Sequence, residues 1–419
     1  MNRFTCRLCV AVALCSAAWA DSACVGQILH SPQPCVLTGN GGLTAGVGAS
    51  GSVSYGRWPS PGHSNQVEKS GLVWGVEVDG RALWLDDAAW LVAAQRVGTT
   101  GILTESAVDS LPLVCTQEVV VHPTRDVLMQ RLTIRGAAGK PSIFWSGAFT
   151  PHLRIIPGLP IDWTFYKSVA FDMDSAAYHV GLVDGGMAEW RQAETMAAVP
   201  ETANWASVDE AVWVACTSET LEFINHPGPG ETMLEMVAEP NPEGAYTATV
   251  AVVFGQTKAG ADSLLEFVRQ QTFESVAAAA ATYWDDWLTD TAVDADLLTL
   301  AQCTDRDSGA IVRSPAEPWL ALDWVRSGAW TTLALDLAGY RDMAEKHTLF
   351  YAGLVRTADK PGMPYGSMPA AVYADGTDGV PSIILEADAP AWMLASFWRH
   401  AQFLEGAARE MYLETVWES

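Results

Sequence analysis

The sequence is poor in positive charge and lacks long apolar runs. It holds 24 Lys and Arg against 49 Asp and Glu, which gives a formal net charge of -25 at pH 7. A surface this acidic repels phosphate backbones and anionic lipid, so neither a nucleic acid nor a membrane surface is expected as a partner. After the N-terminal segment, no stretch reaches the roughly 20 apolar residues of a spanning helix without a charge.

Charged residues of either sign are also scarce, at 17% of the chain, whereas apolar residues make up 49%. This balance is typical of a globular protein and argues against a largely disordered chain. With 419 residues, the chain is long enough for two domains with substantial cores.

The cysteines do not form a metal-binding pattern. After the N-terminal segment, no CxxC motif and no Cys/His spacing of a zinc site is present, and we expect neither a metal nor a cofactor. Of the 8 cysteines, Cys6, Cys9 and Cys15 lie in the N-terminal segment, which leaves an odd number that cannot all pair. Cys24 and Cys35 flank a Pro-containing loop and can form a disulfide in an oxidising compartment.

The N-terminal segment has the features of a secretory signal peptide. Arg3 and Arg7 precede a largely apolar run over residues 8–18, and Ala18-Trp19-Ala20 is a small-x-small cleavage site. The apolar run is too short to span a bilayer. We therefore expect residues 1–20 to be removed by cleavage after Ala20, and the mature protein to be secreted or periplasmic.

Residues 28–260 show the periodicity of an all-β domain. The run 127–135 alternates for much of its length, and 119–121, 211–215 and 246–253 are apolar, strand-like runs. Many strands without intervening helices predict antiparallel sheets that pack face to face.

Residues 46–51 fit the G-x-G-x-x-G pattern of dinucleotide-binding turns. That pattern binds a pyrophosphate only when it follows a strand and opens a helix. Here the strand-like run 52–55 follows it, so a hairpin turn is favoured over a nucleotide site.

The apolar period becomes helical near residue 261. Residues 261–291 are expected to form a linker helix, in which Trp284 and Trp287 lie three apart on one packed face. From 292 to 419 the pattern is helical with long loops. The expected helices cover 294–302, 327–337, 341–355 and 388–406, and a last helix begins near 409.

Two stretches carry the strongest indication of function. The first reads TDRDSGAIV at 304–312, and the second reads LDWVRSGAW at 322–330. They resemble the "TDxxTGAIVASP" and "WPRDGA" stretches at the barrel entry of family 15 glycoside hydrolases, the glucoamylase and glucodextranase family of the six-hairpin glycosidase superfamily. The resemblance implies a multidomain β + α chain: an N-terminal super-β-sandwich over 28–260, the linker helix, and the first part of an (α/α)6 barrel over 292–419.

In that family the Trp, Arg and Asp of the second stretch hold the terminal glucose, which here points to Trp324, Arg326 and Ser327. A planar Trp suits the C–H face of a pyranose, and a guanidinium donates a fixed fork of hydrogen bonds to hydroxyls. The alternative is a barrel-core Trp and a structural Arg–carboxylate pair. Ser327 stands where the family has Asp, and its uncharged hydrogen bonds are weaker by about half.

The segment EADAPAW at 386–392 resembles a further family stretch, "QxDETA", in which Asp388 matches the family Asp. The resemblance implies a sugar contact for Asp388, whereas its place before Pro390 equally suits a helix N-cap. Glu386 stands where the family has Gln and is the unusual carboxylate near the expected pocket. We therefore take Glu386 as the candidate for a catalytic acid.

The first stretch lies, by the same resemblance, at the rim of the sugar pocket. Asp305 and Asp307 flank Arg306 there, and although charged loop residues are usually solvated, Asp307 is kept as a candidate substrate contact. Four histidines have no partner spacing and are assigned to the core or the surface: His122, His152, His347 and His400.

Hydrolysis of a glycosidic bond needs two carboxyl groups, which lie roughly 6.5–9.5 Å apart in inverting enzymes. The family inverts, and its acid and base segments follow the glucose grip, so we expect them beyond residue 419. The expected function is that of an exported, glucoamylase-type glycoside hydrolase that releases terminal sugars from α-glucosidic oligo- or polysaccharides with inversion, catalytically incomplete as given. The alternatives are a related glycoside phosphorylase and a non-catalytic, secreted, carbohydrate-binding remnant.

Overall fold

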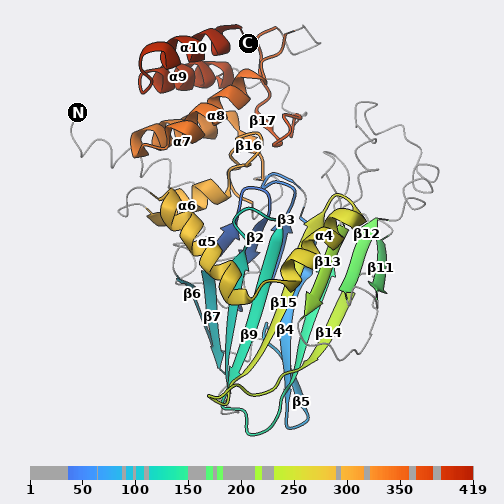
Figure 1. Ribbon diagram of the computed structural model, residues 1–419. Helices are drawn as coiled ribbons and strands as arrows, with labels where there is room; N and C mark the ends of the chain where they lie inside the picture. The colour runs from blue at the N-terminus through green and yellow to red at the C-terminus, as the bar shows by residue number, and fades with distance from the viewer. Residues whose placement is uncertain are drawn as a thin grey trace, which may run out of the picture.

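The computed structural model describes residues 36–63, 65–86, 91–97, 101–107, 113–149, 167–172, 177–182, 213–218, 231–288, 294–315, 321–357, 365–380 and 388–418. The expected signal peptide, the Cys24 and Cys35 pair, His152 and the candidate acid Glu386 lie outside these residues. Within them, the strands of two large sheets occupy 36–255, and α-helices follow from residue 258 (Figure 1).

The β region is built from two antiparallel sheets, as the sequence predicts. The seven-stranded sheet has the order β1-β2-β3-β4-β10-β14, with β5 paired to β4, and the eight-stranded sheet has the order β11-β12-β13-β15-β9-β8-β7-β6. The first comprises β1 (Val36–Gly39), β2 (Thr44–Val47), β3 (Val53–Arg57), β4 (Val67–Val78), β5 (Arg81–Trp84), β10 (Ser142–Phe149) and β14 (Glu231–Val237). The second comprises β6 (Leu91–Val97), β7 (Gly101–Ala107), β8 (Val114–Val121), β9 (Val127–Arg135), β11 (Lys167–Asp172), β12 (Ala177–Leu182), β13 (Trp213–Ser218) and β15 (Tyr246–Gly255).

The main hydrophobic core lies between the two sheets. The seven-stranded sheet contributes Trp74 and Trp145, and the eight-stranded sheet contributes Leu132 and Val252. The indole N–H of Trp145 donates to Oε1 of the buried Gln130, 2.9 Å away, so this large aromatic group brings no unpaired donor into the core.

Helices α4 (Lys258–Arg269) and α5 (Phe273–Trp287) cover the other face of the eight-stranded sheet (Figure 1). Leu265 of α4 and Val276 of α5 belong to one apolar cluster with Met129 of β9 and Val253 of β15. Strand β15 is therefore buried on both faces from Ala248 onward, which explains why its second half, VAVVF, is a continuous apolar run instead of an alternating one.

The expected linker helix over 261–291 corresponds to these two helices, because a new N-terminus forms at Thr272. Its hydroxyl accepts a hydrogen bond from the backbone N–H of Ser275 at 3.2 Å, and the Ser275 hydroxyl accepts one from the Thr272 N–H at 3.0 Å. This reciprocal capping box starts α5 directly after α4 ends. The expected packing role of Trp284 and Trp287 is confirmed: their rings meet edge to face at 5.6 Å.

The remaining helices are stacked above the sandwich in Figure 1. No helix among the described residues combines the length and apolar character of a bilayer-crossing segment. The elements are α6 (Asp294–Gln302), β16 (Asp323–Trp324), α7 (Val325–Ala338), α8 (Arg341–Ala352), β17 (Ala371–Val372), α9 (Ala389–Ala401) and α10 (Gly406–Glu418).

The glycine-rich run at 46–51 forms the turn between β2 and β3. The backbone N–H of Gly48 donates to the carbonyl of Ser52 at 2.8 Å, and Gly51 has a positive φ of 84°. A strand follows this run and not a helix. The hairpin interpretation is confirmed, because the helix N-terminus that would bind a pyrophosphate is absent from this turn.

Candidate functional site

The rim loop, which we define as residues 303–315 after α6, is organised by the buried carboxylate of Asp305. Its Oδ1 accepts hydrogen bonds from the backbone N–H groups of Asp307 at 3.1 Å and Ser308 at 2.6 Å, and from the Ser308 hydroxyl at 2.8 Å. Asp305 therefore shapes the turn from within, whereas Asp307 is exposed on the loop. Of the two rim aspartates, only Asp307 is accessible to a ligand.

Loops of the β-sandwich hold this rim loop in place. The backbone N–H of Arg306 donates to the carbonyl of Gly41 at 3.1 Å, and its guanidinium pairs with Asp126 at 2.9 Å. The buried Arg57 of β3 donates from Nε to the carbonyl of Pro315 at the other end of the loop. The sandwich thus supports the entry to the helical region from below.

Trp324 and Arg326 lie where the short strand β16 becomes helix α7. Trp324 is the N-cap residue of α7 and packs, partly buried, against the cluster formed by Leu322, Ala371 and Tyr373. Arg326, in the first turn, projects its guanidinium to Asp388 at the start of α9, with Nη2 to Oδ1 at 2.8 Å. The two predicted residues Arg326 and Asp388 are therefore brought together across 62 positions of sequence.

Asp388 occupies the N-cap position of α9, but its side chain makes no cap hydrogen bond. The N-cap interpretation is wrong in this respect, because the carboxylate turns to other donors. Oδ1 accepts from Arg326, and Oδ2 accepts from the indole N–H of Trp392 at 3.3 Å. The hydrogen bond from Arg326 is the main reason that the pKa of Asp388 lies below its ordinary value.

The Arg326–Asp388 pair is half open to solvent, with side-chain exposures of 50% and 48%. Beside it, the rings of Trp392 and Trp330 lie 5.1 Å apart, and the guanidinium of Arg399 stands 5.6 Å from the Trp330 ring. An accessible cation, an anion and aromatic faces therefore occur together at the rim end of α7 and α9.

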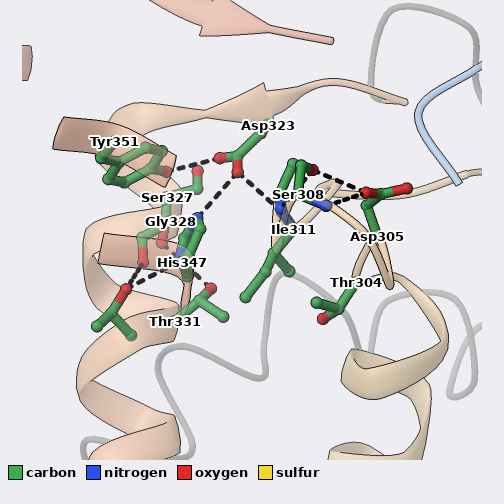
Figure 2. Close-up of polar contacts among 12 residues, drawn as sticks. Thr304, Asp305, Ser308, Ile311, Asp323, Ser327, Gly328, Thr331, His347 and Tyr351 are labelled. Atoms are coloured by element: carbon green, nitrogen blue, oxygen red, sulfur yellow. Dashed lines mark hydrogen bonds and ion pairs between the residues drawn. The ribbon is translucent and has the colours of Figure 1, made fainter. Parts of the chain in front are cut away.

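Ser327 follows Arg326 in the first turn of α7 and is partly buried (Figure 2). Its carbonyl accepts a hydrogen bond from the Thr331 hydroxyl at 3.2 Å. Arg326 therefore finds an anionic partner in Asp388 from α9, while position 327 supplies only a neutral side chain.

Directly before Trp324 lies the fully buried carboxylate of Asp323, which the sequence analysis did not single out. Its Oδ2 accepts from the Ile311 backbone N–H at 2.8 Å and faces Nε2 of His347 at 2.9 Å, while Oδ1 accepts from the Tyr351 hydroxyl at 2.6 Å. Figure 2 shows this carboxylate between α8 on one side and the rim loop on the other. We refer to Asp323, His347 and Tyr351 with the Ile311 N–H as the Asp323 network.

The Asp323 network requires a close approach of α7 and α8. A Cβ atom built on Gly328 would lie 1.7 Å from the Tyr351 hydroxyl oxygen and 2.7 Å from Cε1 of His347. Glycine at this position of the "RSGA" stretch is therefore a packing requirement. Burial, followed by the negative charge of Asp323, raises the pKa of the Tyr351 hydroxyl, so it remains a donor.

His347, assigned from sequence to the core or the surface, lies in the core with a defined partner. The same holds for His400, whose Nδ1 lies 2.8 Å from Oδ1 of the buried Asp336 near the other end of α7. The sequence held one indication of the Asp323 network: His347 and Tyr351 are four residues apart, which places them on one face of α8. No group of three His, Cys, Asp or Glu side chains in the described part of the chain could hold a metal ion.

Comparison with known proteins gives the class of fold. No protein-family model and no curated protein matches the chain. Among solved structures, a bacterial glucoamylase complexed with acarbose superposes with a TM-score of 0.58 and 12% identity over 90% of this chain. A protein from the human microbiome assigned as a kojibiose phosphorylase gives a TM-score of 0.58 and 9% identity over 87% of this chain.

The chain spans little more than half of these relatives, 58% of the glucoamylase chain and 53% of the phosphorylase chain. Their likeness shows that this chain shares their fold over the superposed region. Identities of 12% and 9% define this fold but not the family within it. The family 15 assignment therefore remains a prediction.

Proposed function

We propose that this protein binds the terminal sugar of an oligosaccharide at the Arg326–Asp388 pair, as part of a glycoside-cleaving enzyme of glucoamylase type. The observation that carries this proposal is the half-exposed ion pair, with Trp392 donating to the same carboxylate. An exposed ion pair contributes little to stability, about 0–1 kcal/mol, so folding alone gives little reason for this arrangement.

The chemistry of the pair suits sugar hydroxyls. Each hydroxyl donates one hydrogen bond and accepts others, so an adjacent guanidinium and carboxylate can bind neighbouring hydroxyls of one ring. Trp324 and Trp392 add aromatic faces on which the C–H face of a pyranose can lie. With Ser327 uncharged, Asp388 supplies the negative charge of the grip.

We further propose that the reaction is the inverting release of a terminal sugar from an α-glucosidic chain. Its support is the resemblance of the stretches at 304–312 and 322–330 to family 15, together with the fold shared with the acarbose-bound glucoamylase. Glu386, two residues before Asp388, is the first candidate in this chain for the general acid. General acid–base catalysis contributes about 10²–10⁴ in rate, so Glu386→Gln is expected to lower turnover by about that factor.

A glycoside phosphorylase is the second candidate, because the assigned kojibiose phosphorylase has the same TM-score as the glucoamylase. The two reactions differ in the acceptor, which is water in one and phosphate in the other. Assays with maltose and kojibiose, with and without inorganic phosphate, separate them. Binding without turnover under all of these conditions assigns carbohydrate binding alone to these 419 residues.

Titration calorimetry with acarbose tests the binding site itself. Arg326→Ala is expected to weaken binding by at least about tenfold, since a hydrogen bond from a charged group is worth about 1.5–3 kcal/mol. The matched control is Arg269→Ala on α4, which removes another exposed arginine and its pair with Glu266. If the parent protein binds no acarbose, or if Arg326→Ala binds it equally well, the proposed site is wrong.

Export is proposed from the N-terminal sequence alone. Expression of the full chain in a bacterial host, followed by mass spectrometry of the extracellular and periplasmic fractions, tests it. The expected product begins at Asp21. An uncleaved product confined to the cytoplasm would contradict the proposal.

A further inference from the structure

The Asp323 network joins three donors to one buried carboxylate, yet it takes no part in the proposed sugar grip. Its carboxylate is fully buried and accepts from donors on two other segments, the rim loop and helix α8. A buried carboxylate costs several kcal/mol in lost hydration, and a well-packed apolar side chain often serves stability as well or better. Stability alone therefore does not account for Asp323, and its carboxylate can instead serve to fix the relative positions of α7, α8 and the rim loop.

The geometry that this carboxylate fixes is that of the residues next to it. Trp324 follows Asp323 directly and caps α7 without a side-chain cap hydrogen bond, and Arg326 lies two residues further on, in the first turn of α7. The start of α7 is thus held through the backbone bond from Val325 to the carbonyl of Ala370 at 3.2 Å and through Asp323. Any shift of Asp323 moves the indole and the guanidinium that follow it.

The same carboxylate also fixes the rim. The Ile311 N–H that bonds to Oδ2 belongs to the loop that carries Asp307, on the opposite side of the site from α8 (Figure 2). His347 and Tyr351 approach from α8, and His347 is bonded in turn to the Thr332 hydroxyl of α7 at 2.9 Å. One side chain therefore sets the distance between the rim loop, α8 and the start of α7.

We propose that Asp323, His347 and Tyr351 are positioning residues for the Trp324–Arg326 grip, which they hold in register with the rim loop and with Asp388. This inference rests on the proposed function, because the grip is the sugar site proposed above. None of the three residues contacts the ligand. Their effect on binding passes through the orientation of Trp324 and Arg326.

The experiment compares two buried tyrosine hydroxyls in the full chain. Tyr351→Phe removes one donor from the Asp323 network without changing the shape of the core. Tyr412→Phe is the matched control, because Tyr412 is buried in α10 against His400 and lies outside the network. Both variants are labelled with 5-fluorotryptophan, and the ¹⁹F resonance of Trp324 is identified from its loss in Trp324→Phe.

Tyr351→Phe is expected to shift or broaden the Trp324 resonance and to weaken acarbose binding by about tenfold, the effect of about 1.4 kcal/mol. Tyr412→Phe is expected to change neither measurement. His347→Gln keeps an N–H donor toward Asp323 and is expected to retain more affinity than His347→Leu. These comparisons separate positioning from a general loss of stability.

The proposal is overturned if Tyr351→Phe leaves both the Trp324 resonance and acarbose affinity at the parent values, or if Tyr412→Phe changes them equally. A parent protein that binds no acarbose refutes the proposed function alone. In that case the ¹⁹F comparison still decides whether the Asp323 network orients Trp324, because that measurement needs no ligand.

Discussion

Substitution of Gly328 by alanine tests the closest helix contact in the site. In a solvent-exposed helix, alanine is more favourable than glycine by about 0.8–1.0 kcal/mol. Here, however, the added methyl would lie 1.7 Å from the Tyr351 hydroxyl oxygen. That distance cannot be relieved unless Tyr351 leaves Asp323 or α7 and α8 move apart.

The two costs can be estimated separately. Overpacking of a core by one methyl group costs about 1–3 kcal/mol, and loss of a hydrogen bond to a charged group costs about 1.5–3 kcal/mol. A contact at 1.7 Å needs part of both adjustments. Their full sum is about 2.5–6 kcal/mol, and the helix-propensity gain of about 0.8–1.0 kcal/mol offsets part of it. We expect Gly328→Ala to destabilise the protein by about 2–4 kcal/mol.

Urea denaturation followed by circular dichroism measures this loss. Gly353→Ala is the control, because Gly353 ends α8 with a φ of -68°, and a Cβ there would meet its nearest neighbour, a carbonyl oxygen, at 3.5 Å. In the Tyr351→Phe background, Gly328→Ala is expected to cost less, because the atom it strikes is gone. A Gly328→Ala protein as stable as the parent, or a cost unchanged by Tyr351→Phe, would refute the close approach of α7 and α8.

Three further outcomes are expected. The hydrogen bond from Arg326 holds the pKa of Asp388 below its ordinary value, so carbon-detected NMR is expected to show Asp388 titrating below about pH 3.9 in the parent and nearer that value in Arg326→Gln. Burial raises the pKa of Asp336, so the stability linked to this carboxyl is complete below about pH 3.9 and is lost as pH rises through the raised value. Asp336→Asn should therefore flatten the corresponding slope of the urea midpoint against pH, and an unchanged slope would contradict the assignment. Leu394 and Trp398 are 60% and 62% exposed on α9, so the protein is expected to self-associate, and serine at both positions should lower the mass measured by light scattering.

Local patterns predicted the elements of the fold well. The alternating run 127–135 is strand β9 over the same residues, and the helix expected at 294–302 is α6 over the same residues. Each signal is contained in the element itself, through its apolar period and its turn residues. The linker helix was harder, because the Thr272 and Ser275 capping box interrupts an apolar pattern that continues on both sides of it.

The pairing of Arg326 with Asp388 was only partly within reach of the sequence. Both residues were candidates through their resemblance to a family, but the bond joins positions 62 apart, which no local period indicates. The N-cap alternative for Asp388 was reasonable by local rules, since the residue does precede the helix that Pro390 opens. Asp388 does occupy the N-cap position, but its side chain makes no cap hydrogen bond, because a guanidinium from another helix binds the same carboxylate and a charged donor forms the stronger bond.

Asp323 could not have been predicted from its own neighbourhood, because its three donors come from positions 12, 24 and 28 residues away. Within the sequence it resembles any acidic residue before a helix. What distinguishes it is burial, and burial follows from the close approach of α7 and α8 that Gly328 permits. The glycine was visible in the sequence as part of the motif, but its meaning depends on which side chain packs against it. Arg326 is exposed at the surface of the site, and under the proposal above its position depends on Gly328 and Asp323. We therefore expect a substitution at Gly328 or Asp323 to weaken the proposed sugar binding by moving Arg326, although neither residue contacts the sugar.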